Sequence, residues 1–217
     1  MFGLSADGGA TSIAAANGRY LVTYSTPNGC GGLAQSFRIV EFDATGTEVY
    51  AARYMFGGDT LAPWVAAADP NVWLGSTNAN GSKSAGQWDP AHVASLTQIP
   101  ILPAGPTIRA TAVRKDNSDL YVLADYTANF TVDGRSIVSM FSGMRSLVVV
   151  RWSAAGAGSV VWAKPYGVNT NLIGVAIAFA QGQLVVLGEC LPGNMGIANW
   201  CANTSTNGST FLLSLEP

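Results

Sequence analysis

The sequence predicts an all-β fold made of about four repeats of short antiparallel strands, and three observations lead to this prediction. Short runs of β-branched and aromatic residues alternate with turns rich in Gly, Asn, Ser and Asp along all 217 residues. The same strand–turn–strand order recurs at intervals of roughly fifty residues. Gly and Pro interrupt every window that is long enough for a helix.

The repeat is clearest in residues 146–167, which read SLVVVRWSAAGAGSVVWAKPYG. Two apolar runs, 147–152 and 159–163, flank a turn of small residues, and this composition predicts a hairpin. Residues 36–54 give the same order a second time. The matched positions are Phe42 and Trp152, Gly46 and Gly156, Tyr50 and Trp162, and Tyr54 and Tyr166.

The first repeat begins with two apolar runs, 11–16 and 20–24, separated by Asn17-Gly18. Asn-Gly is a strong signal for a two-residue hairpin turn, so these runs are expected to pair. A loop follows, and residues 36–54 then provide the third and fourth strands. The third strand is expected at residues 37–42.

The second repeat starts with the strand pair at residues 64–76 and is expected to continue with a third strand at 92–96. A weak fourth strand is expected at 98–102, where Pro100 and Pro103 interrupt the pattern.

The third repeat pairs two strands within residues 110–126 around an Asp- and Asn-rich turn, and residues 146–167 complete it. The fourth repeat covers 174–189, with a turn at Gln181-Gly182, and a third strand at 211–215. No fourth strand follows, so residues 1–7 or a neighbouring chain are expected to complete this sheet.

These repeats are interpreted as blades of one domain over residues 1–217. The expected boundaries are residues 11–56, 57–104, 105–167 and 168–217. A single four-stranded sheet cannot bury both of its faces alone, so each must pack on its neighbours. The predicted architecture is therefore a β-propeller, or part of one, with about four blades.

The repeat resembles the bacterial SBBP-type β-propeller repeats. The resemblance lies in copies that begin V-A-x-A, run into V-L-G-E and close with an aromatic residue followed by Ala-Lys-x-Tyr-Gly. Residues 146–189 match best and 12–54 less well, while 57–104 match least because they lack the closing Trp-Ala-Lys pattern. The resemblance implies a surface-exposed or secreted interaction module without shared catalytic residues.

Composition narrows the function classes. Charged residues make up only 11% and apolar residues 48% of the chain, a balance typical of secreted β-rich proteins. The net charge of −2 and the scattered basic residues argue against nucleic-acid binding. No apolar run is long enough for a membrane span, and no leader follows Met1. An extracellular or cell-surface location, with the leader absent from this chain, is expected.

The cysteines support the same location. Cys190 and Cys201 flank a loop rich in Gly and Asn, and a disulfide between them would stabilise that loop. Cys30 lies in a similar loop and is either free or a replacement for one of the two partners. The alternative is three free thiols in a reducing compartment.

Motifs for catalysis are sparse. His92 is the one histidine and has no nucleophile motif beside it. No zinc or nucleotide-binding pattern appears, so neither a metal nor a cofactor is expected. Asp125 and Glu189 occupy the same position in their repeats. They could be the acid and nucleophile of a glycosidase if about 5–9 Å separates them, or exposed acids at strand ends.

Two tryptophans lie in irregular loops, Trp88 and Trp200, where an exposed ring could stack on a sugar or anchor a protein partner. The alternative is that each ring covers its own loop. Four sequons are candidate glycosylation sites: Asn80, Asn129, Asn203 and Asn207.

The predicted function is a non-enzymatic extracellular or surface scaffold that binds a protein partner or a neighbouring subunit. The alternative is a carbohydrate-binding module or glycosidase that uses Trp88, Trp200, Asp125 and Glu189 on a glycan.

Overall fold

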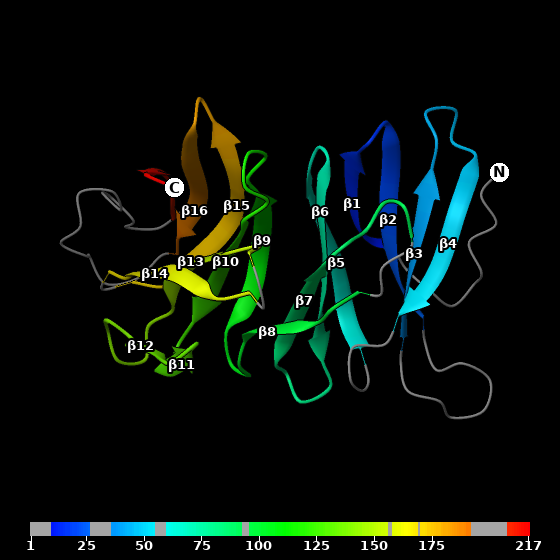
Figure 1. The fold of residues 1–217 in the computed structure, drawn as a ribbon. Coiled ribbons are helices and arrows are strands. Elements are labelled where there is room, and N and C mark those ends of the chain that lie inside the picture. The colour runs from blue at the N-terminus through cyan, green and yellow to red at the C-terminus, as the bar shows by residue number, and fades with distance from the viewer. Residues whose placement is uncertain are drawn as a thin grey trace. The chain divides into compact units, whose positions relative to one another are not determined.

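The computed structural model describes residues 10–26, 36–54, 60–92, 96–155, 158–168, 170–191 and 208–217 (Figure 1). Within these residues all regular structure is β, in antiparallel sheets, as the sequence predicts. The chain divides into two compact units, Met1–Ala104 and Gly105–Pro217. The described part contains no helix long and apolar enough to cross a membrane.

The first sheet of the first unit contains four strands in sequence order (blue to cyan in Figure 1). They are β1 (Ala10–Ala16), β2 (Arg19–Thr26), β3 (Ser36–Phe42) and β4 (Glu48–Tyr54). Asn17 and Gly18 join β1 to β2 with φ of 53° and 67°, the left-handed values that a two-residue hairpin turn requires. The strands predicted in this repeat are confirmed.

The second sheet also has four strands in sequence order, but its third strand is not where the sequence predicts it. The strands are β5 (Thr60–Ala68), β6 (Asn71–Asn78), β7 (Lys83–Gln87) and β8 (Ile99–Leu102). The prediction that residues 92–96 form the third strand of this sheet is wrong, because that place is taken by β7; residues 93–95 themselves lie outside the described residues. His92 instead lies in a turn with φ of 58°, and its backbone N–H bonds to the Asp89 carbonyl.

Strand β7 was not predicted from the sequence because Lys, Ser and Gly have low β-propensity. Its small residues are nevertheless buried, and they suit a crowded position. A Cβ at Gly86 would come within 2.5 Å of the Thr97 carbonyl oxygen and 2.9 Å of the Leu96 side chain. Glycine therefore allows the following segment to lie against the strand.

Lys83 at the start of β7 is buried, and its Nζ donates a hydrogen bond to the Gly81 carbonyl at 2.6 Å. Burial lowers the pKa of Lys83 below its usual value. The unfolded chain then binds more protons than the folded chain at alkaline pH below about 10.4.

We therefore expect the free energy of unfolding of the native chain to rise, relative to Lys83→Met, as the pH increases from 7 to about 10. Urea unfolding of both proteins at the two pH values measures this difference. Parallel changes in both proteins would contradict the expectation.

The second unit contains a four-stranded sheet with spatial order β14-β13-β10-β9 and a separate two-stranded hairpin, β11-β12. The sheet comprises β9 (Thr107–Val113), β10 (Leu120–Tyr126), β13 (Ser146–Trp152) and β14 (Val160–Tyr166). The hairpin, β11 (Phe130–Val132) and β12 (Arg135–Ile137), is inserted between β10 and β13 and was not predicted. It turns at Asp133-Gly134, and the Asp133 carboxylate accepts the backbone N–H of Val160 at 2.9 Å.

The last sheet has three strands among the described residues, in sequence order. They are β15 (Leu172–Ala180), β16 (Gln183–Cys190) and β17 (Ser209–Leu215). The turn at Gln181-Gly182 is confirmed by its φ values of 50° and 80°. Residues 1–7, expected to add a fourth strand, lie outside the described residues, so that expectation stays a prediction.

Within each unit the two main sheets stack through an apolar core. In the first unit β1 lies beside β5, and the core contains Leu21 and Ile39 from one sheet and Leu74 from the other. In the second unit β9 and β10 lie beside β15, and both sheets supply the core. Its buried members are Tyr121, Leu123, Leu147, Val149, Val168, Leu172, Ile177, Leu184, Val186, Cys190 and Phe211. Each fully buried aliphatic side chain stabilises such a core by about 1.5–3 kcal/mol.

Candidate functional site

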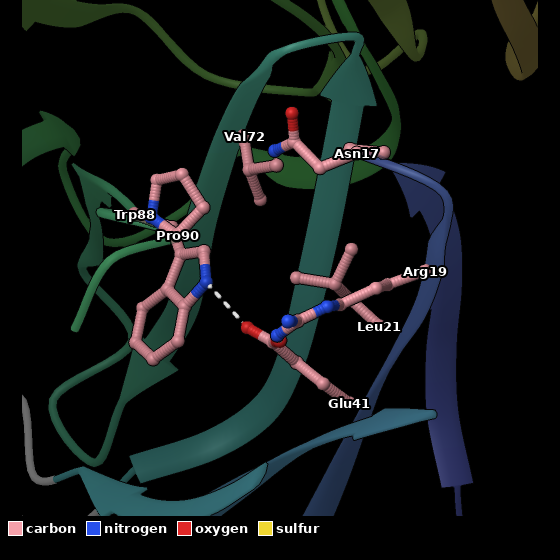
Figure 2. A pocket seen from close by; sticks show the side chains of 8 residues that line it. Asn17, Arg19, Leu21, Glu41, Val72, Trp88 and Pro90 are labelled. Carbon is pink, nitrogen blue, oxygen red and sulfur yellow. Dashed lines mark hydrogen bonds and ion pairs between the residues drawn. The ribbon is translucent and has the colours of Figure 1, made fainter. Parts of the chain in front are cut away.

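The candidate site is a pocket of about 130 Å³ in the first unit, next to the core between its two sheets. Strands β1, β2, β3 and β6 and the segment after β7 contribute its lining (Figure 2). The lining residues are Ala16, Asn17, Arg19, Leu21, Glu41, Val72, Trp88 and Pro90.

Glu41 is the one carboxylate among these lining residues, and only 1% of it is exposed. It lies in β3 and points to the core side of the sheet because it pairs across the strands with Leu21 and Tyr50. Arg19 Nη1 lies 2.6 Å from Glu41 Oε2, and Trp88 Nε1 donates a hydrogen bond to Glu41 Oε1 at 3.0 Å (Figure 2).

His92 is the third group that approaches this carboxylate. Its Nε2 lies 3.3 Å from Glu41 Oε1, and its ring stacks on Tyr50 with 3.5 Å between ring centroids. The Trp88 ring is tilted against both of these rings. His92 Nδ1 is buried and has no hydrogen-bond partner among the described residues.

This geometry limits the chemistry of Glu41. A glycosidase needs two carboxyl groups across the scissile bond, one of which gives up or accepts a proton. Here one carboxylate faces an arginine, an indole N–H and a histidine, so its oxygens are already occupied. No cluster of three metal-ligating side chains occurs in the described ranges of the chain.

Of the two alternatives for Trp88, an exposed ring and a ring that covers its own loop, the structure excludes the exposed ring. Only 6% of Trp88 is exposed, and the ring packs in the core of the first unit. Its backbone N–H bonds to the Val72 carbonyl, and its indole N–H to Glu41. A buried indole N–H needs an acceptor, and Glu41 is that acceptor.

Asp125 and Glu189 do occupy matching positions in β10 and β16, but they differ in burial. Asp125 is buried, contrary to the expectation of an exposed acid at a strand end. It accepts two hydrogen bonds from Arg109, and Arg145 Nε lies 3.2 Å from its Oδ2. The hydrogen bond to Asp125 raises the pKa of Arg109. Glu189 is exposed.

The remaining predicted site residues divide into described and undescribed positions. Asn80 and Asn129 are both exposed, and their side-chain oxygens accept backbone N–H groups from Ser82 and Ser139. Cys190 is buried. The others lie outside the described residues: Trp200, Cys201, Asn203 and Asn207.

Arg19 and Glu41 are not among the site residues predicted from the sequence, although one signal pointed to Glu41. In a strand with alternating faces, Glu41 shares its face with the apolar Ile39, so it points inward. An inward carboxylate needs a cationic or N–H partner. The identity of that partner depends on which strands pair, and strand pairing cannot be read from residue type alone.

Comparisons with known proteins give information about the fold only. No protein-family model matches the chain, and no curated protein matches it. Solved structures do match, among them the phage phi92 endosialidase, with a TM-score of 0.57 and 10% identity. The match covers 96% of this chain and 35% of the endosialidase chain, so the chain spans about a third of that protein's length. At this identity the likeness is one of β-rich fold.

Proposed function

We propose that the chain is a β-propeller-type repeat module, whole or in part, that acts as a non-enzymatic scaffold and binds a protein partner or a neighbouring subunit. One observation carries this proposal: every buried carboxylate of the described residues is paired with arginine. The pairs are Glu41 with Arg19, Asp119 with Arg151, and Asp125 with Arg109 and Arg145.

Such pairs suit a scaffold better than an active site. A catalytic acid or nucleophile must reach a substrate, whereas a carboxylate held by arginine fixes strand positions. Asp119 illustrates this, because it also accepts the backbone N–H of Ala154 at 3.1 Å and so holds the end of β13. The same reasoning applies to the Asp125 pairs between β10 and β9.

The propeller-type arrangement draws support from the sheets themselves. Each main sheet contains strands in chain order, interrupted only by the β11-β12 hairpin among the described residues, and the sheets stack in pairs within each unit. The SBBP-type resemblance and the fold likeness to the longer phage chain agree with this proposal. They do not bear on its activity.

An extracellular or surface location belongs to the same proposal, with a disulfide between Cys190 and Cys201. The scarcity of charged residues supports the location. Peptide mapping under non-reducing conditions tests the disulfide. A linked peptide containing both cysteines is expected, whereas three alkylated thiols in native material would contradict it.

The absence of catalysis is tested with a panel of fluorogenic glycosides that includes sialosides. We expect turnover at the level of the buffer blank for the native chain and for Glu41→Gln alike. Turnover above the blank that falls at least about a hundredfold in Glu41→Gln or Glu189→Gln would contradict the proposal.

A second candidate function is glycan binding at the Glu41 pocket. The pocket combines an indole ring with the polar side chains of Arg19 and Asn17, and a chain of similar fold is an endosialidase. Its volume of about 130 Å³ is below the roughly 300 Å³ of ordinary ligand pockets, which is why this candidate comes second. A glycan array separates the two. Specific binding that is lost in Arg19→Lys, which keeps the charge but not the planar fork, would favour glycan binding.

A further inference from the structure

The first and last sheets each expose large apolar side chains on the face away from their stacked partner. In the first sheet Ile13 is 67% and Tyr20 47% exposed, and in the last sheet Leu212 is 67% exposed. Single exposed apolar side chains are common on protein surfaces, so their exposure alone does not indicate a partner. Their register in the sheets indicates what could cover them.

The exposed face of the first sheet matches a face that is buried in other sheets. Ile13 lies three residues before the last residue of β1, and Val65 and Ile177 have the same position in β5 and β15. Val65 and Ile177 are only 5% and 7% exposed, because each packs against the preceding sheet of its unit. Tyr20 is the second residue of β2, and the second residues of β6 and β16 are Val72 and Leu184. Val72 and Leu184 are buried in the same two cores.

The exposed face of the last sheet matches the opposite half of the same interface. Leu212 pairs with Leu187, which is the fifth residue of β16. Ile39 pairs with Thr23, which is the fifth residue of β2, so the two pairs have the same position in their sheets. Ile39 is 0% exposed in the core beneath the second sheet, whereas Leu212 faces outward. Ala178 likewise has the position of Ala14, which packs against that core.

We propose that the last sheet of one copy packs on the first sheet of a second copy, head to tail. Leu212 of one copy then lies against the surface around Ile13 and Tyr20 of the next. The two faces are the two halves of the interface that already stacks β1–β4 on β5–β8 and β15–β17 on β9–β10. The contact joins two different faces, so it is heterologous. Each copy of a pair still has one free face, so further copies can add and form rings or longer stacks. This inference rests on the proposed scaffold function and names its partner as the chain itself.

Sedimentation velocity of the full chain over a range of concentrations tests the proposal. We expect the native chain to form dimers and larger species as its concentration rises. Leu212→Lys and Ile13→Lys should each weaken this association about tenfold or more, because a lysine would be buried without a partner. Both positions are exposed in the single chain, so circular dichroism should remain native.

Mixing the two variants is the decisive step. Leu212→Lys retains an intact first-sheet face, and Ile13→Lys retains an intact last-sheet face. An equimolar mixture should therefore form a one-to-one dimer and nothing larger. Val138→Lys, at an exposed residue outside both faces, is the control and should assemble like the native chain.

A native chain that stays monomeric at all concentrations, or a mixture that yields no dimer although both variants are folded, would overturn the proposal. These outcomes are independent of the glycoside and glycan assays. Hydrolysis or sugar binding would thus contradict the scaffold function without changing the measured mass.

Discussion

Replacing Arg19 with methionine is expected to lower the free energy of unfolding by about 1–3 kcal/mol, because it removes the cation of a buried carboxylate although the Arg19 side chain is itself 43% exposed. Arg19 is the cation paired with Glu41, and Glu41 is buried inside the first unit. Without it, the carboxylate keeps the Trp88 indole N–H and the nearby His92 as its partners. Those contacts do not replace a full positive charge, and an uncompensated buried charge is costly.

The same sheet provides a matched control. Arg38 pairs with Glu48 at 3.3 Å, and both side chains are well exposed. Arg38→Met should cost only about 0–1 kcal/mol, the usual value of a surface ion pair. Adding Glu41→Gln to Arg19→Met should recover part of the loss, because a neutral amide still accepts the Trp88 hydrogen bond. Equal effects of the two arginine substitutions in urea unfolding would contradict this account of the Glu41 site.

Truncating Leu184 to alanine is expected to cost about 2–5 kcal/mol in the free energy of unfolding. Leu184 lies in β16, is 0% exposed and belongs to the core between the two main sheets of the second unit. Removing its side chain loses apolar burial and leaves a cavity that the close-packed sheets cannot collapse to fill. Thermal or urea unfolding measures the loss.

Leu212 offers the same chemical change on the other side of the same sheet. Leu212→Ala should change the free energy of unfolding by less than about 0.5 kcal/mol at concentrations where the chain is monomeric. A large loss for Leu212→Ala with little loss for Leu184→Ala would mean that the buried and exposed faces of the last sheet have been interchanged.

Much of the fold could be predicted because its signals are local. Turns at Asn17-Gly18 and Gln181-Gly182 and the β-branched strand at residues 147–152 depend on residue type within a short window. Strand β7 could not be predicted in this way, because tertiary crowding at Gly86, and not its own propensity, selects its residues.

The candidate site was less accessible from sequence because its groups come from separate strands. Arg19, Glu41 and Trp88 meet only after β2 pairs with β3 and the second sheet packs on the first. Asp125 was noticed for its position in the repeat, but its partners come from elsewhere in the chain, Arg109 from β9 and Arg145 from the residue just before β13. Register and charge pairing are non-local properties, and residue type alone does not fix them.

The central claim is that sheets of consecutive strands stack face to face, and a double-mutant cycle between Gly174 and Leu123 tests it most directly. Gly174 in β15 faces Leu123 in β10 of the neighbouring sheet, and a Cβ at Gly174 would lie 2.8 Å from the Leu123 side chain. Gly174→Ala alone should therefore cost about 1–3 kcal/mol. In the Leu123→Ala background the added methyl group has room, so the cost should disappear, with a coupling energy of at least about 1 kcal/mol. Additive effects of the two substitutions would contradict the stacking of these sheets.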